Sequence, residues 1–133
     1  MFLKSADAIV KTKPAGSLGE FLNQRIRWAS KADKYKDKKI TAVLLLVYLF
    51  NAWILFLGIL IVFYPILLYW FIAVLIAKTI IELFFLYPVA SFFNKEKMLW
   101  WFPLAQPFHI LYTIVAGWLG KFGSYKWKER KVK

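Results

Sequence analysis

The sequence predicts an all-α membrane protein, in which an interfacial amphipathic helix is followed by a transmembrane hairpin and a third apolar helix, either spanning or re-entrant. Two observations support this fold class. The 133 residues are 61% hydrophobic and carry a net charge of +12, a combination rare in soluble domains. The charges are also segregated, because ten of the nineteen Lys and Arg precede residue 40 and six lie from residue 121 onward. An almost uncharged middle between basic ends is typical of a membrane protein.

Composition also excludes several functions. The basic residues flank lipid-length apolar runs and form no compact patch, so no nucleic-acid partner is expected. The chain has no Cys, which excludes a disulfide framework, a thiolate nucleophile and a Cys-ligated metal. The only histidine, His109, has no ligand at metal-binding spacing and is expected to be a packing or interfacial residue.

The first predicted helix begins at Ser17 and extends to about residue 32. Ser17 with Glu20 three residues later is a capping-box pattern, which marks a helix start. At about 100° per residue, one narrow arc is apolar and is expected to be buried; it consists of Leu18, Leu22, Ile26 and Ala29. A second arc presents an amide, a guanidinium and two aromatic rings; it consists of Phe21, Gln24, Arg27 and Trp28.

A basic link follows at residues 31–39, with five Lys against two Asp. Anionic lipid headgroups attract such a segment by about 1 kcal/mol per charge. The positive-inside rule therefore places residues 1–39 on the cytoplasmic side of a multi-pass protein of the plasma (inner) membrane.

Two membrane-spanning helices are predicted at residues 40–63 and 66–87, on either side of a turn at Tyr64 and Pro65. The first run has 24 uncharged residues, enough to cross a hydrocarbon core of roughly 30 Å. Lys78 and Glu82 lie four residues apart in the second run, on one helical face. We expect them to pair or to reach toward the cytoplasmic end near Pro88. The alternative is that they face a substrate path or a catalytic domain.

The third apolar segment, residues 98–119, leaves the topology open. Pro103 and Pro107 are expected to interrupt a continuous helix, and only 12 residues remain between Pro107 and Gly120. A full crossing would place the basic tail, residues 120–133, outside, against the charge rule. A re-entrant or interfacial segment would keep that tail in the cytoplasm.

The arc of the first helix contains a family motif. Gln24-x-x-Arg27-Trp28 resembles the Gln-x-x-Arg-Trp signature of membrane-bound family-2 glycosyltransferases, the group that includes cellulose, hyaluronan and ceramide-type glycosyl synthases. The surroundings are similar too: a short strand at residues 8–10 precedes the motif, and membrane helices follow it. The tail looks like the Trp-Lys-Gly-Arg ending of some bacterial members, with Glu129 in place of the glycine.

The resemblance implies three substrate-binding residues. Arg27 would contact diphosphate oxygens, Gln24 would hydrogen-bond diphosphate or acceptor oxygens, and Trp28 would support the acceptor sugar. It implies no catalytic residue in this chain, which corresponds to only the last third or so of a family enzyme. Residues 1–39 would be a remnant of the cytoplasmic catalytic domain. The nucleotide-binding domain of such enzymes, with its Asp-x-Asp motif, its catalytic base and its divalent metal, Mg or Mn, is not recognisable here.

The sequence is therefore compatible with two functions. The first is the acceptor-site and membrane-anchor module of a glycosyltransferase that moves a sugar from a nucleotide-sugar donor to a lipid-linked or glycan acceptor. Its partners would be anionic headgroups, an upstream catalytic domain and that acceptor. The second is a small non-enzymatic membrane scaffold or subunit protein. Because no general base, metal ligand or nucleotide pocket is identifiable, we expect no sugar transfer by this polypeptide alone; turnover with any nucleotide sugar would contradict this.

Overall fold

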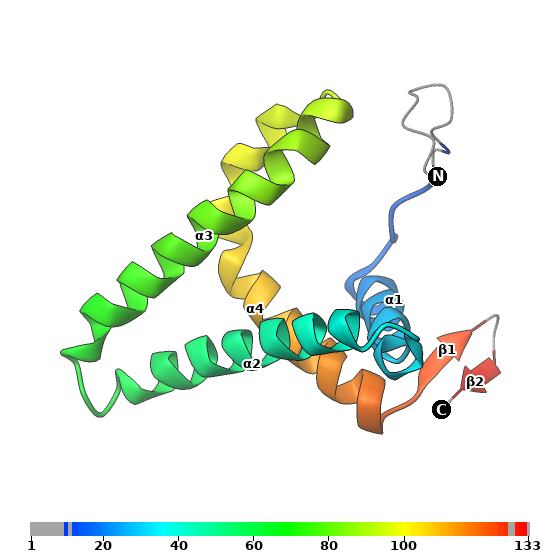
Figure 1. The fold of residues 1–133 in the computed structure, drawn as a ribbon, viewed down its shortest axis with the longest axis horizontal. Helices are drawn as coiled ribbons and strands as arrows, with labels where there is room; N and C mark the ends of the chain where they lie inside the picture. The colour runs from blue at the N-terminus through cyan, green and yellow to red at the C-terminus, as the bar shows by residue number, and fades with distance from the viewer. Residues whose placement is uncertain (1–9, 11, 128–129, 133) are drawn as a thin grey trace.

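The computed structural model describes residue 10, residues 12–127 and residues 130–132 (Figure 1). Most of these residues are helical. The strand predicted at residues 8–10 falls largely outside them, as do Lys128 and Glu129 of the tail motif. The elements in chain order are α1 (Leu18–Ala29), the 3-10 turn η2 (Ala32–Lys34), α2 (Lys38–Leu60), α3 (Leu67–Phe92), the 3-10 helix η3 (Glu96–Trp101), α4 (Phe102–Phe122), β1 (Tyr125–Trp127) and β2 (Arg130–Val132).

Helix α1 begins where the capping box predicts. The Ser17 hydroxyl accepts a hydrogen bond from the Glu20 N–H at 3.2 Å, and the Glu20 carboxylate accepts one from the Gly16 N–H at 2.7 Å. These bonds satisfy donors that a helix start leaves without partners. The helix ends at Ala29, three residues before the predicted end at residue 32, and the Ser30 hydroxyl donates to the Arg27 carbonyl at 2.9 Å.

Helices α2 and α3 are, among the described residues, the two that are long and apolar enough to cross a membrane, with 23 and 26 residues. Helix α2 starts two residues before the predicted span, because the Asp37 carboxylate accepts from the Lys39 N–H at 2.9 Å and caps it. The chain reverses between the two helices, which meet near this turn and diverge away from it (Figure 1).

Helix α3 continues five residues beyond its predicted end at residue 87. Pro88 lies inside the helix and removes one backbone donor without ending it. The helix ends at Phe92, and Asn94, two residues later, has a left-handed backbone with φ of 54°. The Asn94 N–H donates to the Ser91 carbonyl and the Lys95 N–H to the Ala90 carbonyl, at 3.0 and 2.8 Å. This is a Schellman cap, with asparagine in the position that glycine usually takes.

Helix α4 corrects the expectation that prolines interrupt the third segment. Its helical turns run from Phe102 to Phe122 without a break. Pro103 lies in the first turn, where a backbone N–H has no helical partner to lose. Pro107 lies farther inside and removes one donor, yet the helix continues and packs against α1 and α2. The predicted start at residue 98 falls within η3, which is wound as a 3-10 helix.

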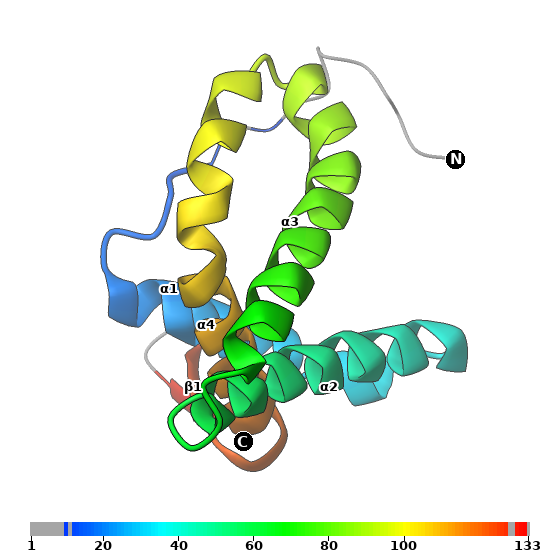
Figure 2. The same cartoon turned by 90° about the vertical axis from the view of Figure 1, so that its left-hand side faces the viewer.

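Helix α4 joins the other helices together (Figures 1 and 2). It runs parallel to α1, because Phe21 contacts Phe108 near the start of both helices and Ala29 lies against Gly120 near their ends. The glycines permit this close approach: a Cβ on Gly117 would lie 2.5 Å from the Tyr48 ring of α2. Among the described residues, the buried apolar side chains are Ile26, Ile54, Leu57, Ile110 and Ala116.

The apolar arc predicted for α1 is confirmed only in part. Ile26 is buried, and Ala29 lies against Gly120. Leu18 is 69% exposed, so its predicted burial is wrong. Leu18 is the first residue of α1 and lies one turn before Phe21. Phe21 is the residue that contacts the aromatic rings of α4.

The basic tail contains two short strands. Strand β1 pairs antiparallel with β2, with Tyr125 opposite Val132. Strand β1 also lies beside α1. The end of the described chain is thus near the helix that carries the Gln-x-x-Arg-Trp motif (Figure 1).

Candidate functional site

The three predicted substrate-binding residues lie together on α1. The Trp28 side chain is 48% exposed, whereas Gln24 and Arg27 are partly buried. All three are in the second half of the helix, outside the two candidate membrane spans. The helix therefore presents an open indole surface beside an amide and a guanidinium, as the arc predicts.

Arg25 is a further member of this site that the motif does not specify. Its guanidinium lies over the rings of Phe21 and Trp28 at 4.8 and 4.7 Å from their centroids. It also lies 5.6 Å from the ring of Tyr112, which comes from α4. A guanidinium at these distances is attracted by the aromatic ring faces.

An aromatic cluster supports Arg25 from the α4 side. Phe21 contacts Tyr112 edge to face at 5.1 Å, and Phe108 lies 5.8 Å from Phe21 and 5.5 Å from Tyr112. Burial raises the pKa of Tyr112 above its usual range, although the charge of Arg25 opposes this shift. The ring contacts of this cluster pack α1 against α4.

A second cluster of polar side chains links α3 to α4. The Lys78 ammonium donates to Glu82 Oε1 at 2.5 Å and to Gln106 Oε1 at 3.0 Å, and lies 3.4 Å from His109 Nδ1. The Gln106 amide donates to the other carboxylate oxygen of Glu82 at 2.6 Å. Lys78 is 4% exposed and Gln106 is fully buried. The expected pairing of Lys78 with Glu82 is present, and the pair faces α4.

His109 closes this cluster at the boundary with the aromatic rings. Its ring lies 5.2 Å from Tyr112 and its Nδ1 is 3.8 Å from the Glu82 carboxylate. His109 lies on α4, which is not one of the two described helices that are long and apolar enough to span a membrane. Burial lowers the pKa of His109, the charge of Lys78 lowers it further, and Glu82 opposes both. A neutral imidazole fits this place, because it accepts a hydrogen bond from the ammonium.

No group of three or more side chains suited to a metal ion occurs among the described residues. The Glu82 carboxylate, which lies among other polar side chains, already pairs with the Lys78 ammonium and accepts a hydrogen bond from the Gln106 amide. The described residues thus contain an exposed indole beside polar side chains, and an ion pair whose ammonium is buried and whose carboxylate is partly exposed.

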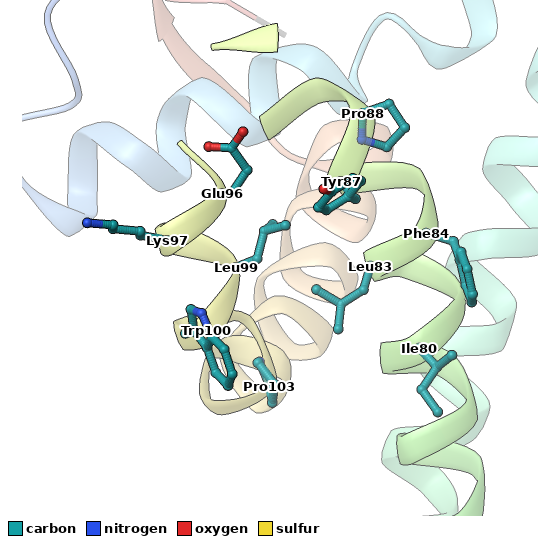
Figure 3. Close-up of a pocket in the computed structure, with 10 residues that line it drawn as sticks. All are labelled: Ile80, Leu83, Phe84, Tyr87, Pro88, Glu96, Lys97, Leu99, Trp100 and Pro103. Atoms are coloured by element: carbon teal, nitrogen blue, oxygen red, sulfur yellow. The ribbon is translucent and has the colours of Figure 1, made fainter. Parts of the chain in front are cut away.

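A groove of about 810 Å³ lies between the second half of α3 and the η3 segment (Figure 3). Leu83 and Tyr87 on α3 and Leu99 on η3 point toward one another across it. Pro103 closes one side, and the charged residues Glu96 and Lys97 lie at the rim. The groove is almost wholly apolar and is separate from the α1 surface.

No family model, curated protein or solved structure matches this chain.

Proposed function

We propose that the chain is the acceptor-site and membrane-anchor module of a family-2 type glycosyltransferase. It would help to move a sugar from a nucleotide-sugar donor to a lipid-linked or glycan acceptor at the cytoplasmic face of the plasma membrane. The observation that carries the proposal is the half-exposed Trp28 on α1, on the same helix as Gln24 and Arg27 and covered on one side by Arg25. The catalytic base, the nucleotide pocket and the Mg or Mn ion would belong to a catalytic domain.

Each motif residue has a role suited to its chemistry. The indole of Trp28 offers an apolar surface on which a sugar ring can stack. Arg27, near the end of α1, can bind two oxygens of a diphosphate through its planar guanidinium. Gln24, one turn earlier, carries both a donor and an acceptor for sugar hydroxyls.

The packing of α4 favours the re-entrant topology for this module. In the proposed orientation α2 and α3 cross the bilayer as a hairpin, and α1 lies on the cytoplasmic surface. The end of α4 lies against α1. A Cβ added to Gly120 would be only 2.7 Å from the Cβ of Ala29. A full third crossing would separate these two points by the thickness of the bilayer. The tail therefore stays on the side of α1, in agreement with its positive charge.

Sugar binding at Trp28 tests the proposal directly. The full chain is labelled with 5-fluorotryptophan, placed in lipid nanodiscs, and titrated with tetrasaccharides of glucose, N-acetylglucosamine, mannose or galactose. At least one sugar is expected to shift the fluorine resonance of Trp28, and Trp28→Ala is expected to weaken binding by about fivefold or more through loss of stacking.

Trp118→Ala is the matched control, because Trp118 is also exposed but lies at the end of α4 against Phe122. It should leave sugar affinity unchanged. If no sugar shifts Trp28, or if Trp28→Ala binds as well as the parent chain, the acceptor-site role is wrong. The non-enzymatic scaffold or subunit then becomes the better interpretation.

A further inference from the structure

We propose that the groove between α3 and η3 binds one acyl chain of an anionic membrane phospholipid, with the headgroup phosphate at Lys95 and Lys97. The proposal rests on the membrane setting inferred above for α2 and α3. It does not depend on sugar binding at Trp28, because the groove and the α1 surface share no residue.

The shape of the groove suits a hydrocarbon chain. Its volume of about 810 Å³ lies within the range of pockets that enclose small ligands. Leu83, Tyr87 and Leu99 form facing apolar walls (Figure 3). The Schellman cap at Asn94 keeps these walls apart, because it ends α3 and turns the chain sharply into η3.

The position of the groove suits the boundary between hydrocarbon and headgroups. It lies along the second half of α3, one of the two candidate spans, and along η3 from Glu96 to Trp100. Trp100 and Trp101 on η3 are both strongly exposed. Exposed indoles are enriched at headgroup level, so the η3 side of the groove is expected to lie there.

The charges at the rim select the headgroup. Glu96 and Lys97 line the groove, and the Lys97 ammonium points away from the apolar lining (Figure 3). Lys95, next to Glu96 in the chain, adds a second positive charge nearby. An acyl chain in the groove would bring its own phosphate toward these ammonium groups. In the proposed orientation this rim faces the cytoplasmic leaflet, which is the one rich in anionic lipids.

A peptide is a poorer occupant than a lipid. A peptide chain brings N–H and C=O groups that need hydrogen-bond partners when they leave water. The side chains of the lining offer few such partners: the Tyr87 hydroxyl, the Trp100 indole N–H, and the rim residues Glu96 and Lys97. An acyl chain has no polar group to satisfy, and each buried methylene favours its transfer.

Photolabelling in nanodiscs tests the site. The full chain is reconstituted with phosphatidylglycerol or phosphatidylcholine carrying a diazirine on one acyl chain, and labelled peptides are located by mass spectrometry. Phosphatidylglycerol is expected to label residues 80–103 about tenfold more than phosphatidylcholine does. The double variant Lys95→Gln, Lys97→Gln should abolish this preference, since it removes the positive charges that attract the headgroup phosphate. Lys36→Gln, Lys38→Gln is the control, with the same charge change outside the groove.

Filling the groove provides an independent arm. Leu83→Trp and, separately, Leu99→Trp should remove labelling of residues 80–103 by either lipid, while Leu111→Trp on the exposed side of α4 should not. Equal labelling by the two lipids, labelling spread evenly over all exposed helix faces, or labelling that survives both tryptophan variants would overturn the proposal. Trp28→Ala should not affect labelling, so failure here is distinguishable from failure of the sugar role.

Discussion

Glu82→Gln is expected to destabilise the protein by about 3–5 kcal/mol, the usual cost of removing one partner from a buried ion pair. The substitution keeps the shape of the side chain but leaves the Lys78 ammonium, only 4% exposed, without a counter-charge. Gln106 and His109 supply dipoles there but no negative charge. Unfolding of the full chain in mixed micelles by SDS, followed by helicity, measures the change in free energy.

The double variant Lys78→Met, Glu82→Gln is the matched comparison. It removes both charges and leaves an amide at position 82 that can still accept from the Gln106 amide. We expect its stability to lie within about 1.5 kcal/mol of the parent chain, since replacing both members of a buried pair is often nearly neutral. A double variant as unstable as Glu82→Gln alone would show that the ion pair itself stabilises the fold.

Gly120→Ala is expected to separate α1 from α4, at a cost of about 1–3 kcal/mol for overpacking. The added Cβ would lie 2.7 Å from the Cβ of Ala29 and 2.9 Å from the Ser30 backbone nitrogen. Backbone cannot rotate aside as a long side chain can, so α1 must move. The chain has no Cys, and spin labels at Glu20→Cys and Leu111→Cys would report the shift as a longer, broader distance distribution.

Gly19→Ala is the control for this experiment. A Cβ on Gly19 would meet only the Ser17 hydroxyl, at 3.9 Å. Alanine is also the better helix former, by up to about 1 kcal/mol. This variant should preserve the distance between the labels and leave stability equal or higher. An unchanged distance in Gly120→Ala would mean that α1 is not fixed to α4 at this point.

Local signals in the sequence predict the helices well. The Ser17 and Glu20 capping box predicts the start of α1 to the residue. The uncharged runs predict α2 and α3 because helix formation and apolar length depend on neighbouring residues alone. The ends are less well predicted, since Pro88 is compatible with a helix that continues to Phe92, just before the left-handed Asn94.

Contacts between helices are what the sequence leaves open. The spacing of Lys78 and Glu82 predicts that they pair, but nothing local to α3 indicates that Gln106 and His109 complete the cluster from α4. Close approach at Gly120 likewise depends on a neighbour far away in sequence. Such pairs are set by packing, which periodicity within one helix does not encode.

In the candidate site, too, the sequence predicts what lies within one helix but not the contacts between helices. The arc with Gln24, Arg27 and Trp28 follows from helical geometry, and α1 does place them together. Arg25 was overlooked because it is a variable position of the motif, although its spacing of four from Phe21 and three from Trp28 could have indicated the contacts. Tyr112 contacts Arg25 from another helix, α4, so no spacing within α1 could have indicated this contact.

The ion pair of α3 bears on how the protein is made. Lys78 and Glu82 meet within a single helix, so their charges can cancel before any other part of the chain is present. In the proposed membrane setting, helix α3 would leave the translocation machinery for the lipid as an electrically neutral segment, while α4 is still being synthesised. Gln106 and His109 would arrive later in translation and bind a helix that has already been inserted.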